Sequence, residues 1–147
     1  MLWIVLLLAA AAPAAPAQSG ELFGTWSATY GQRVFQGAWT AAAQQEADIG
    51  YGTWRLLDAS GKTVLGGAWS ARKVKAEWRG SWRADVQGGG AYTGTWEAAV
   101  KAKGAAAFSE LLETAIREVV SGGWALPDGR SGAWSIRAAR AGTEPRP

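Results

Sequence analysis

The segment LFGTWSATY (residues 22–30) contains a Gly-x-Trp motif, Gly24-Thr25-Trp26, that occurs eight times in the 147-residue chain. The eight motifs end at Trp26, Trp39, Trp54, Trp69, Trp82, Trp96, Trp124 and Trp134. The first six lie 13 to 15 residues apart, and a fixed short period is typical of a repeated structural unit. Turn-forming stretches fall between motifs: DASGK (58–62), QGGG (87–90) and PDGR (127–130). This pattern predicts strands joined by hairpins in an antiparallel meander.

Alternation along a strand places the Gly and the Trp of each motif on one face. In the first motif that face reads Leu22, Gly24, Trp26 and Ala28, and the order apolar, Gly, Trp, small recurs in four other motifs. The eighth strand departs from this order with Arg130 at the leading position. The opposite face is polar nearly throughout, with Thr25, Ser27, Thr53, Arg55, Ser70, Arg72, Arg79, Ser81, Arg83, Asp85, Thr95 and Glu97.

Eight antiparallel strands with one apolar face avoid unpaired edges by closing into a barrel. Inside a barrel each indole needs an opposing vacancy, which a Gly on a neighbouring strand supplies. We therefore predict an all-β fold, an eight-stranded antiparallel up-and-down β-barrel in which the Gly-Trp pairs form one layer of the core. Trp78 and Tyr92 are expected together at one end of this barrel.

A longer interval interrupts the repeat between Trp96 and Trp124, which lie 28 residues apart. Apolar residues follow helical spacing within it, at Phe108, Leu111, Leu112, Ala115, Ile116, Val119 and Val120. The sequence predicts one amphipathic helix over about residues 105–120, between strands six and seven and ended by Gly122 and Gly123. Because the outer wall is polar, we expect this helix to dock across one mouth of the barrel rather than on the outside.

The composition excludes several kinds of chemistry. The chain has 10 Trp and 20 Gly but no Cys and no His, so disulfides, thiolate metal sites and Ser-His or Cys-His catalysis have no residues to use. The one close acidic pair, Glu46 with Asp48, lies in an expected loop and provides too few oxygen ligands for Ca²⁺. We therefore expect a protein that is not an enzyme and that holds no metal and no cofactor.

The first 17 residues are typical of an export signal. The apolar run MLWIVLLLAAAA is followed by Ala-Pro-Ala at 15–17, which fits a cleavage site. An uncleaved membrane anchor is the alternative, but two prolines cut the run below the roughly 20 residues of a spanning helix. We expect a signal peptide over 1–17, one barrel domain over 18–142 and a disordered tail over 143–147, in a protein exported to the periplasm or the extracellular space.

The first motif resembles the Gly-x-Trp of the calycin superfamily, which includes the lipocalins and the avidins. The stretch GTWSATYG (24–31) is similar to the first strand of avidins, with Gly31 in place. Where avidins carry the Asn and Ser that bind biotin, this chain has Ala28 and Gln32, and Arg137 is the candidate for the last-strand arginine that lipocalins place over the first Trp. The resemblance implies a small meander barrel that binds one compact ligand.

A barrel of eight strands is wide enough either to be filled by its own side chains or to hold one small ligand. The first functional hypothesis is an exported, non-enzymatic protein that binds a small apolar or aromatic molecule inside a Trp-lined barrel. The expected ligand-lining residues are Trp26, Trp39, Trp54, Trp69, Trp78, Trp82, Tyr92, Trp96, Trp124 and Trp134. The alternative is a structural or interaction protein of the cell envelope with a filled core and no ligand.

A basic cluster in ARKVKAEWRGSWR (71–83) is a second candidate surface. Its cations are Arg72, Lys73, Lys75, Arg79 and Arg83. Together they suit an anionic partner in the cell envelope, and a solvated outer face is the alternative. Nucleic acid is not an expected partner, because Trp78 and Trp82 point inward and leave no stacking platform beside the charges.

A third architecture follows from the same pattern. If the Gly-Trp face met lipid, the chain would be a small outer-membrane barrel with a polar lumen. Tryptophans of such barrels form girdles at the two membrane interfaces rather than a layer at mid-strand. We therefore expect a barrel that does not span the membrane.

Overall fold

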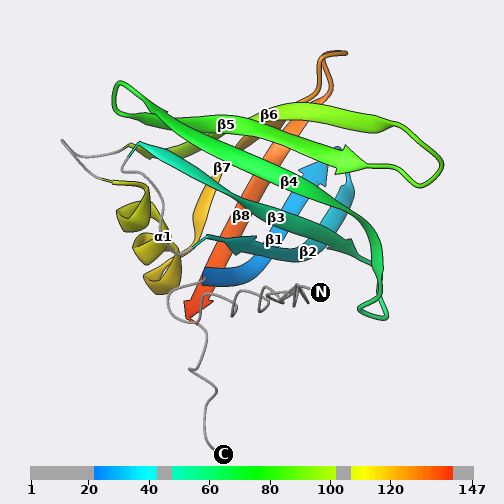
Figure 1. Cartoon of the computed structure of the whole chain (residues 1–147), viewed down its shortest axis with the longest axis horizontal. Coiled ribbons are helices and arrows are strands. Elements are labelled where there is room, and N and C mark those ends of the chain that lie inside the picture. Colours follow the sequence, from blue (N-terminus) through cyan, green and yellow to red (C-terminus); the bar gives the residue numbers. More distant parts are fainter. Residues whose placement is uncertain (1–21, 43–47, 102–106, 141–147) are drawn as a thin grey trace, which may run out of the picture.

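The β-strands form one closed sheet. The computed structural model describes residues 22–42, 48–101 and 107–140, so the expected signal peptide and C-terminal tail lie outside the described residues. The strands are β1 (Leu22–Tyr30), β2 (Arg33–Ala41), β3 (Ile49–Leu57), β4 (Thr63–Val74), β5 (Glu77–Asp85), β6 (Ala91–Lys101), β7 (Val120–Ala125) and β8 (Ser131–Arg140). Each pairs antiparallel with the next, β8 pairs with β1, and helix α1 (Phe108–Arg117) lies between β6 and β7 (Figure 1). The predicted fold class is confirmed.

The two ends of the barrel differ. Short turns join β1 to β2, β3 to β4, β5 to β6 and β7 to β8 at one end, here called the turn end, and α1 lies at the opposite end, the helix end (Figure 1). Gly61 and Gly129 adopt positive φ, 83° and 92°, in two of the predicted turns, a conformation that Gly enters without steric cost. In the β3–β4 turn the Asp58 carboxylate accepts hydrogen bonds from the Ser60 hydroxyl and backbone N–H, and the hydroxyl bond in particular lowers the pKa of Asp58.

The repeating unit is the two-stranded hairpin, which occurs four times, rather than the single strand. In the β1–β2 hairpin Trp26 faces Gly37 and Trp39 faces Gly24, so each Trp lies opposite the Gly of its partner strand. The other hairpins repeat this register in the pairs Trp54–Gly67, Trp69–Gly52, Trp82–Gly94, Trp96–Gly80, Trp124–Gly132 and Trp134–Gly122. The predicted vacancy for each indole is therefore confirmed, and it lies within the same hairpin.

Six of these glycines also let an indole donate to a carbonyl oxygen on the strand beyond. A Cβ added to Gly37 would overlap both the Trp26 indole and the Arg55 carbonyl oxygen of β3. The Trp26 N–H donates to that same oxygen, with Nε1 and O 3.1 Å apart. A Cβ at any of the other seven motif glycines would likewise overlap a carbonyl oxygen or an indole. Only Gly leaves room for the ring and for the close approach of the backbone.

The tryptophans form two layers, where the sequence predicted one. The Trp follows the Gly in every motif, and neighbouring strands run in opposite directions, so alternate strands carry their Trp toward opposite ends. The turn-end layer is Trp26, Trp54, Trp82 and Trp124, and the helix-end layer is Trp39, Trp69, Trp96 and Trp134. Rings within a layer meet edge to face, with centroids 5.9 Å apart for Trp26 and Trp54 and 5.7 Å apart for Trp96 and Trp134.

The expectation that Trp78 and Tyr92 share one end is wrong. Trp78 contacts Phe108 of α1 at the helix end, with ring centroids 5.0 Å apart. Tyr92 pairs with Ala84 beside the β5–β6 turn, at the turn end. Both residues precede the Gly of their motif by two positions, and on antiparallel strands that shared position falls at opposite ends.

Helix α1 closes the helix end. Its buried residues Phe108, Leu111, Leu112 and Ala115 form one cluster with Trp39, Ala41, Ala71, Trp78 and Val120. The strand residues of this cluster come from β2, β4, β5 and β7, on different sides of the barrel. The helix therefore docks across a mouth, as the polar outer wall led us to expect.

The predicted C-terminal end of the helix is wrong. The helix ends at Arg117, and both Gly122 and Gly123 lie within β7. Gly122 faces Trp134 of β8, so it serves the barrel as a motif glycine. A pair of glycines after an apolar periodic stretch is ambiguous, because the same residues suit a helix end and a crowded strand.

These adjacent glycines provide a test of the packing. A Cβ at Gly122 would overlap the Glu97 carbonyl oxygen and the Trp134 indole, whereas the nearest atom to a Cβ at Gly123 is 3.7 Å away. We expect Gly122→Ala to lower the free energy of unfolding by about 3 kcal/mol, as for overpacked cores, and Gly123→Ala to change it by less than about 0.5 kcal/mol. Urea denaturation followed by Trp fluorescence measures both, and equal effects would contradict the assigned role of Gly122.

Candidate functional site

The indoles of the turn-end layer lie toward the mouth opposite helix α1. Trp26, Trp54, Trp82 and Trp124 are each only partly buried. At the helix end Trp39 is buried and Phe108 packs on Trp69, with ring centroids 5.7 Å apart, while Trp69, Trp96 and Trp134 are partly buried like the turn-end indoles. The helix thus covers one side of the aromatic core, and the turn-end layer faces the opposite mouth.

Two tyrosines stand at the rim of the turn end. Tyr30 ends β1 and lies 6.0 Å from the Trp124 ring, centroid to centroid. Tyr92, near the start of β6, has 58% of its surface exposed. Together with the four indoles of the turn-end layer they form an aromatic surface, here called the turn-end aromatic cluster. Rings of this kind supply a large contact area for an apolar partner.

Most indole N–H groups bind the barrel's own backbone. In the turn-end layer, Trp26 donates to Arg55, Trp54 to Arg83 and Trp124 to Thr29, always to the carbonyl oxygen and at 3.1 Å. The indoles of the helix-end layer also donate to backbone carbonyls, at Arg137, Thr40, Ser70 and Gly123. Among the described residues Trp82 has no such bond. Apart from Trp82, the rings of this layer therefore present faces and edges, rather than hydrogen-bond donors, to anything at this end.

One ion pair lies at the same rim. Arg130 donates from Nε and Nη2 to the Asp128 carboxylate, at 2.8 and 2.7 Å. This bond lowers the pKa of Asp128 and raises the pKa of Arg130, and the nearby phenols of Tyr30 and Tyr92 add smaller effects on Arg130. The charges of the pair largely cancel, so the rim carries no strong field of either sign.

The ten residues predicted to line a ligand site divide between two adjacent layers, which meet where Trp39 pairs with Trp54, Trp69 with Trp82 and Trp96 with Trp124. The turn-end aromatic cluster contains Trp26, Trp54, Trp82, Tyr92 and Trp124 of that set. The other five are Trp39, Trp69, Trp78, Trp96 and Trp134, which lie toward the helix end. Sequence reasoning missed Tyr30, although alternation from Trp26 places it on the inner face.

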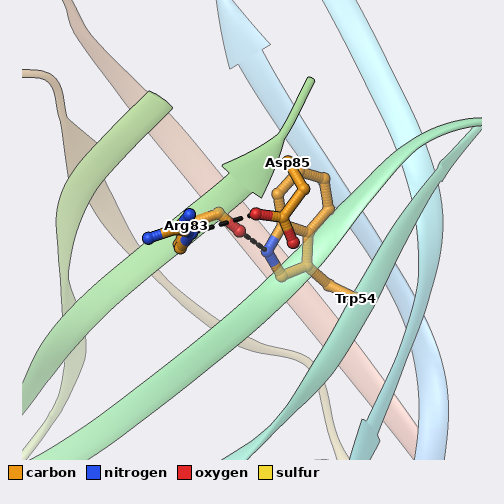
Figure 2. A network of polar contacts seen from close by, with 3 residues as sticks. All are labelled: Trp54, Arg83 and Asp85. Carbon is orange, nitrogen blue, oxygen red and sulfur yellow. Dashed lines mark hydrogen bonds and ion pairs between the residues drawn. The ribbon is translucent and has the colours of Figure 1, made fainter. Parts of the chain in front are cut away.

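The basic cluster is divided by strand alternation and by ion pairs. Arg79 pairs with Glu77, and Arg83 pairs with Asp85, at 2.6 and 2.9 Å. Figure 2 shows the Arg83 pair beside the indole of Trp54, which donates to the Arg83 carbonyl. Arg72 and Arg79 face each other across β4 and β5, and Lys75 occupies the β4–β5 turn with φ 58°.

The Lys73 side chain does not lie on the outer face with the other cations of the cluster. Its ammonium binds the Asp48 carboxylate at 3.1 Å and lies 6.0 Å from the centre of the Trp78 ring. Its side chain is 12% exposed, so it anchors the β2–β3 connection instead of joining an exposed charged surface. The other member of the predicted acidic pair, Glu46, lies outside the described residues.

Two hollows lie outside the barrel. One, of about 410 Å³, lies at the β4–β5 turn and is lined by Val74, Lys75, Ala76, Glu77 and Arg79. The other, of about 210 Å³, crosses β2 and is lined by Phe23, Gly24, Ala38, Trp39, Thr40, Thr53, Trp54 and Arg55. Sequence reasoning missed the second hollow, since its walls come from three strands whose register no local pattern reveals. The one sequence signal for this hollow was Phe23, an apolar residue at an outward-facing position.

Two absences concern the described residues, 22–42, 48–101 and 107–140. No group of three or more Asp, Glu, His or Cys residues is placed there to hold a metal ion. No helix in those ranges has the length and apolarity needed to cross a membrane.

Comparisons of the chain with protein-family models, with curated proteins and with solved structures find no match. The likeness to calycins therefore rests on the closed antiparallel meander of eight strands. One expected correspondence differs: Arg137 faces Thr25 on the exposed outer wall, and the β8 residue opposite Trp26 is Ile136.

The two indoles Trp54 and Trp82 provide a matched test of the hydrogen bonds. Both are partly buried in the turn-end layer, but only Trp54 has a bonded N–H. Replacement by Phe keeps an aromatic ring and removes the donor. We expect Trp54→Phe to lower the free energy of unfolding by about 1 kcal/mol more than Trp82→Phe, since it leaves the Arg83 carbonyl without this partner. Guanidinium denaturation measures the difference, and a larger loss for Trp82→Phe would contradict the assignment.

Proposed function

We propose that this protein is an exported, non-enzymatic binding protein that holds a small apolar or aromatic molecule at the turn end of its barrel. The observation that carries the proposal is the difference between the two mouths. Helix α1 packs across one, while the turn-end aromatic cluster lies at the other, where Tyr92 is 58% exposed. A concave wall of aromatic rings with few polar groups is typical of a small-molecule site.

The state of the indole N–H groups supports an apolar ligand. Trp26, Trp54 and Trp124 already donate to backbone oxygens, so a ligand meets their ring faces and edges. Aromatic rings gain free energy from offset or edge-to-face contacts with another flat ring. The rim pair Asp128–Arg130 is internally neutralised, which gives a charged ligand little advantage.

The residues of the outer wall favour a barrel whose outer surface contacts water. Hydroxyl pairs cross neighbouring strands on this wall, Thr40 with Thr53 at 2.6 Å and Ser70 with Ser81 at 2.9 Å. Exposed arginines occupy the same wall. A lipid-facing wall has an apolar band instead, so these residues favour an aqueous compartment over the outer-membrane alternative.

A filled-core structural or interaction protein of the cell envelope is the second candidate function. The observation in its favour is that both hollows described above lie outside the barrel. In this case the tryptophans serve only to close and stabilise the sheet, and partners bind the outer wall.

Titration with the apolar fluorophore N-phenyl-1-naphthylamine tests the ligand site. We expect saturable binding, seen as a rise in probe fluorescence and quenching of Trp emission. Tyr92→Ala should raise the dissociation constant about three- to tenfold through the loss of one aromatic contact. Tyr51→Ala is the matched control, because Tyr51 lies on the outer wall and is similarly exposed, 53% against 58%.

Absence of saturable binding, or equal effects of the two tyrosine variants, would contradict a site at the turn end. Native mass spectrometry of the chain purified from an exporting host separates the two candidate functions. A mass excess of a few hundred daltons that is lost on denaturation indicates a bound molecule, whereas the bare mass favours the filled core.

A further inference from the structure

We propose that the hollow across β2 on the outer wall is a binding subsite for one acidic sugar ring. The hollow has a volume of about 210 Å³, below the roughly 300 to 1,000 Å³ of clefts that hold drug-sized molecules. It therefore suits a single ring. It lies on the outside of the sheet, and the turn-end aromatic cluster lies on the inside.

The strand register builds the hollow from two walls and a floor. Phe23 on β1 pairs with Thr40 on β2, which pairs with Thr53 on β3. Two residues further along these strands, Arg55 on β3 pairs with Ala38 on β2. Phe23 and Arg55 thus rise on either side of β2, about 12 Å apart at the backbone, because two strand spacings and an offset of two residues separate them. The small Ala38 side chain leaves the space between them open.

The lining groups match the surface of a sugar ring. Phe23 is 44% exposed, so its ring is available to the apolar C–H face of a pyranose. The hydroxyls of Thr40 and Thr53 share one hydrogen bond of 2.6 Å. Because each hydroxyl has one donor and two acceptor sites, the pair retains one proton and further lone pairs for a ligand hydroxyl.

Arg55 gives the hollow its preference for an anion. Its side chain makes one long polar contact, from Nη1 to the Thr63 hydroxyl at 3.4 Å, and no carboxylate among the described residues pairs with it. Arg79 and Arg83, on the same wall, are both neutralised by carboxylates. A guanidinium binds a carboxylate through two parallel hydrogen bonds. A ring bearing a carboxylate, as in a uronic acid, uses all four lining groups.

Nuclear magnetic resonance of the ¹⁵N-labelled chain tests this site, with galacturonate and galactose as probes that differ only in the carboxylate. We expect saturable shifts with galacturonate at the amides of Phe23, Ala38, Thr40, Thr53 and Arg55, and at least tenfold weaker binding of galactose. Shifts confined to the turn-end aromatic cluster, or none up to saturating probe, would overturn the proposal.

Charge-matched variants exclude a general attraction of anions. Arg55→Gln should weaken galacturonate binding about tenfold, the loss expected for one charged hydrogen-bonded contact. Arg83→Gln removes the same charge from β5 and should leave binding unchanged. Phe23→Ala should weaken both sugars alike, and both wall residues are exposed, so the barrel still folds. Equal weakening by Arg55→Gln and Arg83→Gln would overturn the site.

Discussion

The contact between a motif glycine, an indole and a carbonyl oxygen is the constraint from which the rest of the structure follows. Where the strand has no Cβ, the partner's indole lies across it and its N–H reaches the backbone of the next strand, as Trp26 does over Gly37 toward Arg55. The hydrogen bond satisfies a polar group that would otherwise be costly to bury. The close backbone approach at the same point bends the sheet, and eight such points bend it into a closed barrel.

Because the motif has the same direction along every strand, the core contains two layers of four indoles whose surroundings differ. Trp follows Gly in all eight motifs, so the antiparallel order sends four indoles toward the helix and four toward the turns. The helix packs its apolar face on the first group. The second group lies at the opposite end from this helix, beside the rim tyrosines Tyr30 and Tyr92. The asymmetry between the mouths, on which the proposed ligand site depends, thus arises from an identical local motif repeated on strands of alternating direction.

The fold could be predicted from the sequence because local signals agree: the Gly-x-Trp period, the turn glycines and the alternation of faces. The two-layer arrangement and the opposite placement of Trp78 and Tyr92 could not, since they depend on register across strands. Likewise, Lys73 sits in a basic run, but its pairing with Asp48 depends on a non-local contact. Phe23 and Arg55 are 32 residues apart in the chain and meet only across β2. Sites assembled from several strands are hidden from any linear pattern.

The indole hydrogen bonds also determine how the chain can fold. Trp39 of the first hairpin donates to Arg137 of the last strand, 98 residues away, and Trp124 donates to Thr29, 95 residues away. An isolated hairpin lacks these two acceptors, although Trp26, Trp39, Trp69 and Trp134 also have a carbonyl acceptor within their own hairpin. Chains dominated by such distant contacts fold slowly, since loop closure precedes the stabilising contact. We expect closure of this barrel to be a late step, because β1 of a growing polypeptide cannot complete its pairing until the eighth strand is available.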